Sequence, residues 1–279
     1  MRPYIDAHSH IGWTITRDPI VGQSTGRYMA RMASSGVVAA AIGPTAVGSP
    51  QARGVLDTQE QNQVIARACQ QFPDRFPIGL ALIELRHERA GVTELERAMQ
   101  QDGLRGIMWH PSGGSMPMPR LYPFLEVAAM GKGLCLLHGK AADNAALARR
   151  FPELTFVAHA GHEEAVTLCA PLDNIIFEVV QRPRGAGSEW DFAQLVNQLG
   201  SERILFGSDA PYYDWRVLQA ALEAAAVSEA IKDRIAYQNA ISLVRRFVPN
   251  WTLPADPVVS PQRYPTEELW AVRGERFIS

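Results

Sequence analysis

The sequence predicts one (β/α)8 barrel, a TIM barrel, over residues 1–247, with a short C-terminal extension over 248–279. Three observations predict this fold: strand-like and helix-like segments alternate along the chain, the apolar runs are continuous, and the two kinds of loop differ in length. Continuous apolar runs are typical of strands that are buried on both faces of a parallel sheet. Eight strand–helix units in about 250 residues match a barrel.

The expected strands are the short apolar runs at 3–7, 37–42, 77–83, 104–109, 133–138, 154–159, 174–180 and 203–207. Amphipathic segments between them predict helices at 24–35, 57–72, 92–101, 121–131, 141–151, 161–170 and 188–199, and helical sequence follows from 214 to 247. An open, doubly wound sheet would show the same alternation. No Gly-x-Gly-x-x-Gly or Gly-x-x-x-x-Gly-Lys motif follows a strand, so the nucleotide-binding forms of that alternative lose support.

The links between elements indicate where the functional residues lie. Links from a helix to the next strand are short, as at Ser35-Gly36 and Asp102-Gly103. Links from a strand to the next helix are long and rich in Gly and Pro, as at 9–23 and 43–56. A barrel enzyme carries its site at the carboxyl ends of the strands, so we expect the functional residues there. The extension is too short for another domain and is expected to pack on the barrel or a neighbouring subunit.

The composition favours a small-molecule enzyme. The chain is 47% hydrophobic and 20% charged with a net charge of −2, and no basic cluster predicts a nucleic-acid or membrane partner. Cys69, Cys135 and Cys169 include no Cys-x-x-Cys pair, which argues against disulfides and zinc–thiolate sites. Without a signal-peptide pattern or a membrane-length apolar run, we expect a cytoplasmic protein.

The first expected strand ends in a pattern that is typical of metal sites. Asp6, His8 and His10 are two residues apart, so an extended chain would place all three side chains on one side. Two imidazoles held this close can form half of a first-row metal site. One packed and one exposed histidine would explain the pair equally well.

The positions of the other histidines favour the metal site. His110, His138 and His159 end the fourth, fifth and sixth expected strands, and Asp209 ends the eighth. Six of the seven histidines lie at or just beyond strand ends, His87 being the exception. Packed or surface histidines would not be expected to gather in this way.

These residues carry a resemblance to a known family. The matching segments are Asp6-Ala7-His8-Ser9-His10, Gly106-Ile107-Met108-Trp109-His110-Pro111, the strand-end histidines His138 and His159, Ile204-Leu205-Phe206-Gly207-Ser208-Asp209-Ala210-Pro211, and Asn239-Ala240 followed by Leu243. In order and spacing they resemble the amidohydrolase superfamily, in particular its aminocarboxymuconate-semialdehyde decarboxylase-like branch. The resemblance covers residues 3 to 247.

The resemblance implies a metal site and roles for its residues. His8, His10, His138 and Asp209 would bind one divalent metal, zinc in the first place and manganese as the alternative, while Asp6 would orient a histidine. Asp209 would also act as general base or proton shuttle. His159 would polarise a substrate oxygen or move protons, although it binds a second metal in binuclear relatives. Some relatives carry a lysine that bridges two metals on the fourth strand; Met108-Trp109-His110 stands there in this chain, which favours one metal.

Further residues are candidates for contact with the substrate. Arg182 and Arg184 could hold a substrate carboxylate by bidentate pairing, or simply be solvated. His110 could contact the substrate or the loop that it opens. Trp13 and Tyr212 could line the pocket or only cover the barrel.

Three functions follow as hypotheses. The first is a hydrolase in which a metal-activated water attacks an ester, lactone or amide of a small, possibly carboxylated molecule. The second is a non-oxidative decarboxylase of an unsaturated or aromatic acid, which can use the same ligands. The third is a non-catalytic metal-binding barrel. The Pro-rich tail and the resemblance also suggest a homodimer.

Overall fold

The computed structural model describes residues 2–12, 24–44, 53–110, 118–159, 163–180, 192–256 and 258, apart from the side chains of His159 and Glu163. The strands are β1 (Tyr4–Ile11), β2 (Val37–Pro44), β3 (Ile78–Gly79), β4 (Ala81–Leu82), β5 (Gly106–Trp109), β6 (Leu134–Leu137), β7 (Thr155–His159), β8 (Ile175–Val179) and β9 (Ile204–Phe206). The α-helices are α1 (Thr25–Ser35), α2 (Val55–Gln71), α3 (Glu88–Gln100), α4 (Met118–Met130), α5 (Ala141–Arg150), α6 (Glu163–Cys169), α7 (Phe192–Leu199), α8 (Trp215–Ala224), α9 (Glu229–Asp233) and α10 (Asn239–Phe247). Short 3₁₀ turns η1 (Leu85–His87) and η2 (Ser201–Arg203) and a π-helical turn η3 (Arg234–Gln238) complete the described elements.

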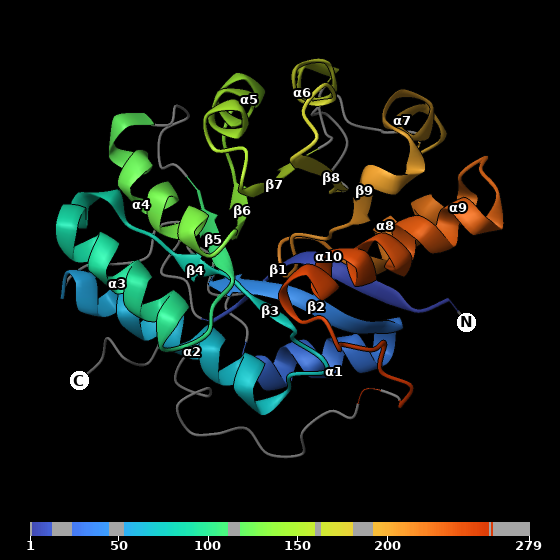
Figure 1. The fold of residues 1–279 in the computed structure, drawn as a ribbon. Coiled ribbons are helices and arrows are strands. Elements are labelled where there is room, and N and C mark those ends of the chain that lie inside the picture. Colours follow the sequence, from blue (N-terminus) through green and yellow to red (C-terminus); the bar gives the residue numbers. More distant parts are fainter. Residues whose placement is uncertain are drawn as a thin grey trace.

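The strands form a closed parallel barrel, as the sequence predicts. Two ladders, β1-β2-β3 and β4 to β9, contain only parallel pairs. The barrel closes where the Asp209 N–H donates to the His8 carbonyl (2.8 Å) and the His10 N–H to the Ala210 carbonyl (2.7 Å). Figure 1 shows helices α1 to α8 following one another around the strands. The open, doubly wound alternative is therefore wrong.

The predicted third strand, 77–83, is interrupted in the structure. Leu80, between β3 and β4, still donates its N–H to the Ile42 carbonyl (2.8 Å), so the two pieces act as one barrel strand. Beyond it, the Leu82 N–H donates to Asn62 Oδ1 of α2 (2.8 Å). At Leu82 an amide side chain thus replaces the backbone acceptor that β2 would provide.

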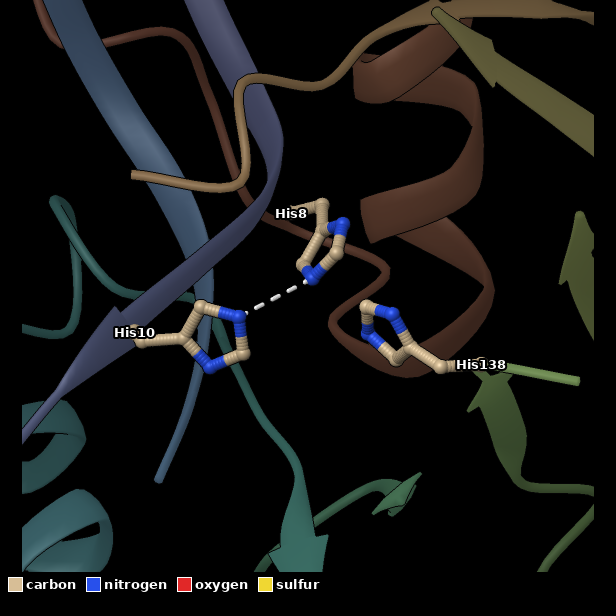
Figure 2. A group of neighbouring side chains, drawn as sticks. All are labelled: His8, His10 and His138. Carbon is tan, nitrogen blue, oxygen red and sulfur yellow. Dashed lines mark hydrogen bonds between the residues drawn. The ribbon is translucent and has the colours of Figure 1, made fainter. Parts of the chain in front are cut away.

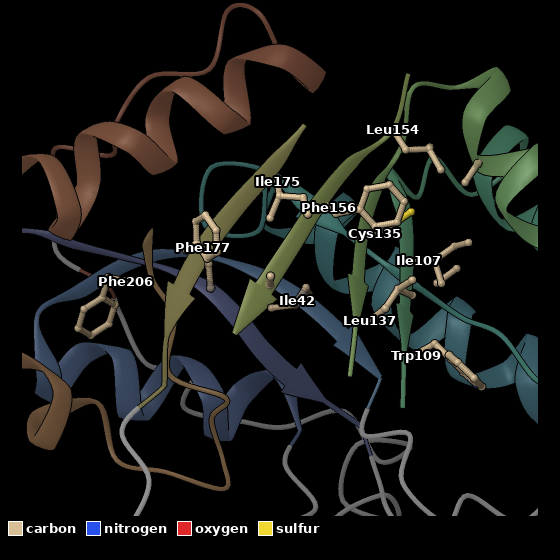
Figure 3. Packing of buried hydrophobic residues seen from close by; sticks show 14 of the residues in the cluster. Ile42, Ile107, Trp109, Cys135, Leu137, Leu154, Phe156, Ile175, Phe177 and Phe206 are labelled. Carbon is tan, nitrogen blue, oxygen red and sulfur yellow. The ribbon is translucent and has the colours of Figure 1, made fainter. Parts of the chain in front are cut away.

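Both faces of the strands are buried, which explains the continuous apolar runs. Ile107, Phe156 and Phe177 face outward and pack between the strands and the helices (Figure 3). Their neighbours Met108 and Val157 belong to a second cluster that fills the barrel. Burial of one such side chain stabilises the fold by roughly 1.5–3 kcal/mol.

The amino-terminal end of the barrel is covered by α10, whose Leu243 and Val244 join the interior cluster. The Asn239 side chain donates to the carbonyls of Ser201 and Ile204, both at 2.7 Å, and so fixes α10 at the start of β9. After α10, Trp251 is buried against this end of the barrel. Among the described residues, no helix has the length and apolar character needed to cross a membrane.

Candidate metal centre

A β-bulge in β1 determines where its polar side chains point. Asp6 pairs with Ala40 and Ser9 with Ile42, so three steps along β1 match two along β2. The extra residue shifts the alternation of side chains by one. Asp6 and Ser9 therefore share the outer face, where Tyr28 Oη lies 3.3 Å from Asp6 Oδ2 and 2.7 Å from Ser9 Oγ.

The prediction that Asp6 shares a face with His8 and His10 is therefore wrong. The fully buried Asp6 carboxylate accepts hydrogen bonds from the Ser208 N–H (2.9 Å), the Ser208 hydroxyl (2.5 Å) and the Trp215 indole (2.6 Å). Burial raises the pKa of Asp6, and the hydrogen bonds from Ser208 and Trp215 oppose that rise. Toward His8, Asp6 accepts the backbone N–H (3.2 Å) and not an imidazole N–H. Its hydrogen bonds from Ser208 fasten the end of β9 to β1.

We expect Asp6→Ala to lower the free energy of unfolding by about 3 kcal/mol, because it leaves several buried donors without an acceptor. Urea unfolding of the metal-free protein measures this loss. Asp214→Ala is the comparison variant, because Asp214 is an exposed helix cap whose removal costs about 1 kcal/mol. Equal losses in the two variants would show that Asp6 does not join the strands.

Three histidines point toward one another at the carboxyl end of the barrel (Figure 2). Each of His8, His10 and His138 offers a nitrogen, and these atoms lie within 4.8 Å of one another. His8 and His10 come from β1, while His138 directly follows β6 and donates its N–H to the Trp109 carbonyl (2.9 Å). The barrel thus brings together residues that are 128 or more positions apart in the chain.

Hydrogen bonds on the far side of two rings fix which nitrogen faces the centre. His10 Nδ1 lies 2.9 Å from the Pro44 carbonyl oxygen, which can only accept, so this nitrogen carries the hydrogen. His8 Nδ1 lies 2.8 Å from Glu178 Oε1 and donates to that carboxylate. Both Nε2 atoms then face each other at 3.1 Å. Two nitrogens bound to one tetrahedral zinc ion lie about 3.3 Å apart.

Asp209 adds a carboxylate to the histidines. Its Oδ1 lies 2.9 Å from His10 Nε2 and 3.5 Å from His8 Nε2. The backbone of Asp209 has φ = 57°, in the left-handed region that residues other than glycine seldom adopt. The two barrel-closing hydrogen bonds on either side of it hold this conformation. A strained residue at the barrel mouth is typical of a functional position.

The donor set fits a divalent cation. Two Nε2 lone pairs and a carboxylate converge on one point, and such acceptors repel one another unless a cation lies between them. Burial lowers the pKa of His8, but the negative charges of Glu178 and Asp209 outweigh burial and raise it to about 9. In the metal-free protein, a proton on His8 therefore provides the positive charge between these acceptors. Imidazole and carboxylate ligands suit zinc and manganese alike.

Metal uptake is expected to release about one proton per ion at pH 7 to 8, because the metal must displace the His8 proton. Apparent affinity should rise with pH by up to about tenfold per unit and level off above about pH 9, the pKa of His8. Calorimetric titration in buffers of different ionisation enthalpy measures the proton count. An affinity and proton count that do not change between pH 7 and 10 would contradict this role of His8.

Two predicted substrate-contact residues lie beside the centre. The exposed His110 ring lies 5.0 Å from the His138 ring between centroids. The Tyr212 ring meets the His10 ring edge-on, with centroids 5.5 Å apart and planes at 86°, and is 37% exposed. Burial and the charge of Asp209 raise the pKa of Tyr212 to about 12, so its hydroxyl stays protonated at neutral pH.

Four other predicted residues have side chains outside the part of the chain that the structure describes. Trp13, Arg182 and Arg184 lie outside the described residues. The backbone of His159 ends β7 and pairs with Glu178 of β8, but its side chain lies outside the described part.

Glu178 is the residue that sequence reasoning missed. It lies in the predicted strand 174–180 and is completely buried. A charged residue inside an apolar strand with two buried faces was the available signal, because unpaired carboxylates are almost never fully buried. Its partner, His8, is 170 residues away in the sequence, so no local pattern could identify the pair.

Known proteins share this fold over most of the chain, although no curated protein matches it in sequence. One solved structure is 5-carboxyvanillate decarboxylase from Sphingomonas paucimobilis, with 16% identity, a TM-score of 0.69, and coverage of 88% of this chain and 99% of that one. A second is 2,6-dihydroxybenzoate decarboxylase from Rhizobium, with 16% identity, a TM-score of 0.67, and coverage of 88% and 99%. A third is dihydroxybenzoic acid decarboxylase from a Polaromonas species, solved with manganese and the inhibitor 2-nitroresorcinol; identity is 15%, the TM-score 0.67, and coverage 88% and 97%. At these identities the likeness concerns the fold.

A family model provides the sequence match. The model described as Amidohydrolase matches residues 5–246, which include His8, His10, His138 and Asp209. The resemblance that the histidine pattern predicts is therefore confirmed, and the chain belongs to the amidohydrolase family.

Proposed function

We propose that the protein is a metal-dependent, non-oxidative decarboxylase of a small aromatic or unsaturated carboxylic acid. The observation that carries the proposal is the agreement between the fold of this chain and three aromatic-acid decarboxylases over 88% of its length. The convergent histidines and Asp209 support it, because a metal-dependent decarboxylase uses a cation to hold the substrate oxygens and a proton-transferring group beside them. The decarboxylase thus takes precedence over the hydrolase that the sequence favours.

We assign metal binding to His8, His10, His138 and Asp209. When bound, a divalent cation supplies Lewis-acid polarisation of the substrate oxygens. Zinc and manganese are alternative candidates for this ion, since the Polaromonas enzyme was solved with manganese. The chain has no lysine in Met108-Trp109-His110, which favours a single metal.

We assign proton transfer to the Asp209 carboxyl group. When the bond to the carboxylate breaks, its electron pair stays on the substrate carbon, the carboxylate leaves as CO₂, and one proton must reach that carbon. The Asp209 carboxylate would take this proton up from solvent and pass it to the carbon, and so return to its ionised form. The Asp209 side chain is 17% exposed, so it can reach both the histidines and a substrate at the rim. We further assign polarisation of a substrate oxygen to His159, contact with an aromatic ring to Tyr212 and His110, and pairing with a second anionic group to Arg182 and Arg184.

The test is a panel of hydroxybenzoic and enoic acids given to the zinc- and manganese-loaded enzyme. Expected results are CO₂ release and, in D₂O, a product with one deuterium at the carbon that lost CO₂. Lactones and esters are assayed in parallel by proton release at constant pH. Hydrolysis of these compounds without CO₂ from any acid would reject the decarboxylase.

A hydrolase is the second candidate, favoured by the description of the matching family model. In that case Asp209 would remove a proton from the attacking water instead of protonating carbon. The same parallel assay separates the two functions.

The predicted extension and homodimer are separate proposals. We propose that residues 248–279 pack on the barrel or a neighbouring subunit, as Trp251 already packs on the interior cluster. Light scattering coupled to size-exclusion chromatography of the full chain, and of a chain ending at residue 258, tests both proposals.

A further inference from the structure

The carboxylate of Glu178 is buried in a position where it would destabilise the fold unless its charge were compensated. It stands inside β8, and its side chain has no exposed surface. Removing a carboxylate from water costs several kcal/mol unless charges and hydrogen bonds compensate it. The compensation comes from the centre itself, because Glu178 Oε1 lies 2.8 Å from Nδ1 of the equally buried His8.

The neighbouring strand leaves room for this carboxylate. A Cβ atom at Gly207, just after β9, would lie 2.4 Å from Glu178 Oε2 and 3.0 Å from Glu178 Cβ. The first distance is shorter than real Cβ atoms show and the second is unusually tight. Gly207 does not have the positive φ that would require glycine. The absence of a side chain at Gly207 is therefore what lets Glu178 extend toward His8.

Glu178 lies on the opposite side of the His8 ring from the metal centre. Its oxygen meets Nδ1, whereas His8 Nε2 faces His10 Nε2 at 3.1 Å. The ring therefore separates Glu178 from the point where the ligand atoms converge, so this residue acts through His8.

We infer that Glu178 is the positioning residue of the metal site, which fixes the tautomer and angle of His8 and supplies a second negative charge. This inference rests on the metal site of the proposed function. The three imidazoles of the site are neutral when they bind a metal. The ionised carboxylates of Glu178 and Asp209 then contribute two negative charges, which balance one divalent cation. Carboxylates that hold ligand histidines typically contribute ten- to a hundredfold in metal affinity.

The test measures the Kd for Zn²⁺ and Mn²⁺ by competition with a chromogenic chelator. Glu178→Gln keeps an acceptor but removes the charge, so we expect affinity to fall about tenfold; Glu178→Leu removes both, and we expect about a hundredfold. Glu94→Gln is the matched control, because Glu94 is also a buried carboxylate but pairs with Arg97 on α3. It should leave the Kd unchanged.

Gly207→Ala provides a second test that does not alter Glu178 chemically. The added methyl group should displace the Glu178 carboxylate and weaken metal binding about tenfold. In the Glu178→Leu background the same change should have little further effect, since coupled residues are not additive. A proton resonance of His8 Nδ1–H, shifted downfield by the carboxylate in the zinc-loaded protein, should move back in Glu178→Gln.

The outcomes separate this inference from the proposed function. Parent-like metal affinity in Glu178→Gln, or equal losses from Gly207→Ala in both backgrounds, would overturn the role of Glu178. Metal binding that depends on Glu178 supports the inference, even if no acid in the panel loses CO₂ and the proposed reaction fails. A parent protein that binds neither metal would overturn both.

Discussion

His10→Ala is expected to weaken divalent-metal binding by about a hundred- to a thousandfold and to abolish metal-dependent activity. A site with four protein ligands provides roughly 10–16 kcal/mol of binding free energy, so one ligand contributes about 2.5–4 kcal/mol. Each 1.4 kcal/mol corresponds to about a tenfold change in affinity. His10 is a sensitive position because its Nε2 lies within 3.1 Å of both His8 Nε2 and Asp209 Oδ1. Competition with a chromogenic chelator measures the change.

The matched control is His87→Ala. His87 belongs to the 3₁₀ turn η1 and is not among the histidines that gather at the centre. Its removal should leave the metal Kd within about twofold of the parent, because a residue outside the site affects binding by less than 0.5 kcal/mol. If His10→Ala and His87→Ala bind metal equally well, the centre lies elsewhere.

Asp209→Asn is expected to lower kcat by roughly 10²–10⁴-fold, the range that a positioned proton donor contributes. Asparagine keeps the size of the side chain and tolerates the left-handed backbone at φ = 57°, so the loss should reflect the carboxylate. Metal content has to be measured in the same sample, because Asp209 is also an assigned ligand. Activity is measured on the best acid of the panel with saturating metal.

The control for this variant is Asp214→Asn on the same segment. Asp214 caps α8 by accepting the Arg216 N–H (2.9 Å), and asparagine caps helices about as well. Its kcat should match the parent value. An Asp209→Asn enzyme that keeps parent kcat when fully loaded would exclude proton transfer by Asp209.

The fold could be predicted because burial leaves a direct pattern in the sequence. Continuous apolar runs at 133–138 and 203–207 follow from strands with two buried faces, and the structure has β6 and β9 there. The end of pairing with β2 at Leu82 could not be predicted, because the Leu82 N–H bonds the Asn62 side chain of another element. Tertiary hydrogen bonds of this kind leave no periodic signal.

The candidate site could be predicted in part. Strand ends of a parallel barrel meet at one rim, and this placed His8, His10, His138 and Asp209 near one another. The prediction for Asp6 was wrong, because a bulge changes the two-residue period that the argument assumed. Glu178 was missed because its function depends on a contact with His8 and on the space beside Gly207, which only the folded barrel creates.

Elemental analysis of the purified, reconstituted protein tests the central claim most directly. With His8, His10, His138 and Asp209 as one ligand set, the parent should hold about one divalent ion per chain, and His10→Ala almost none after the same dialysis. A parent that retains no metal would contradict the metal site, and two ions per chain would contradict the single-metal centre.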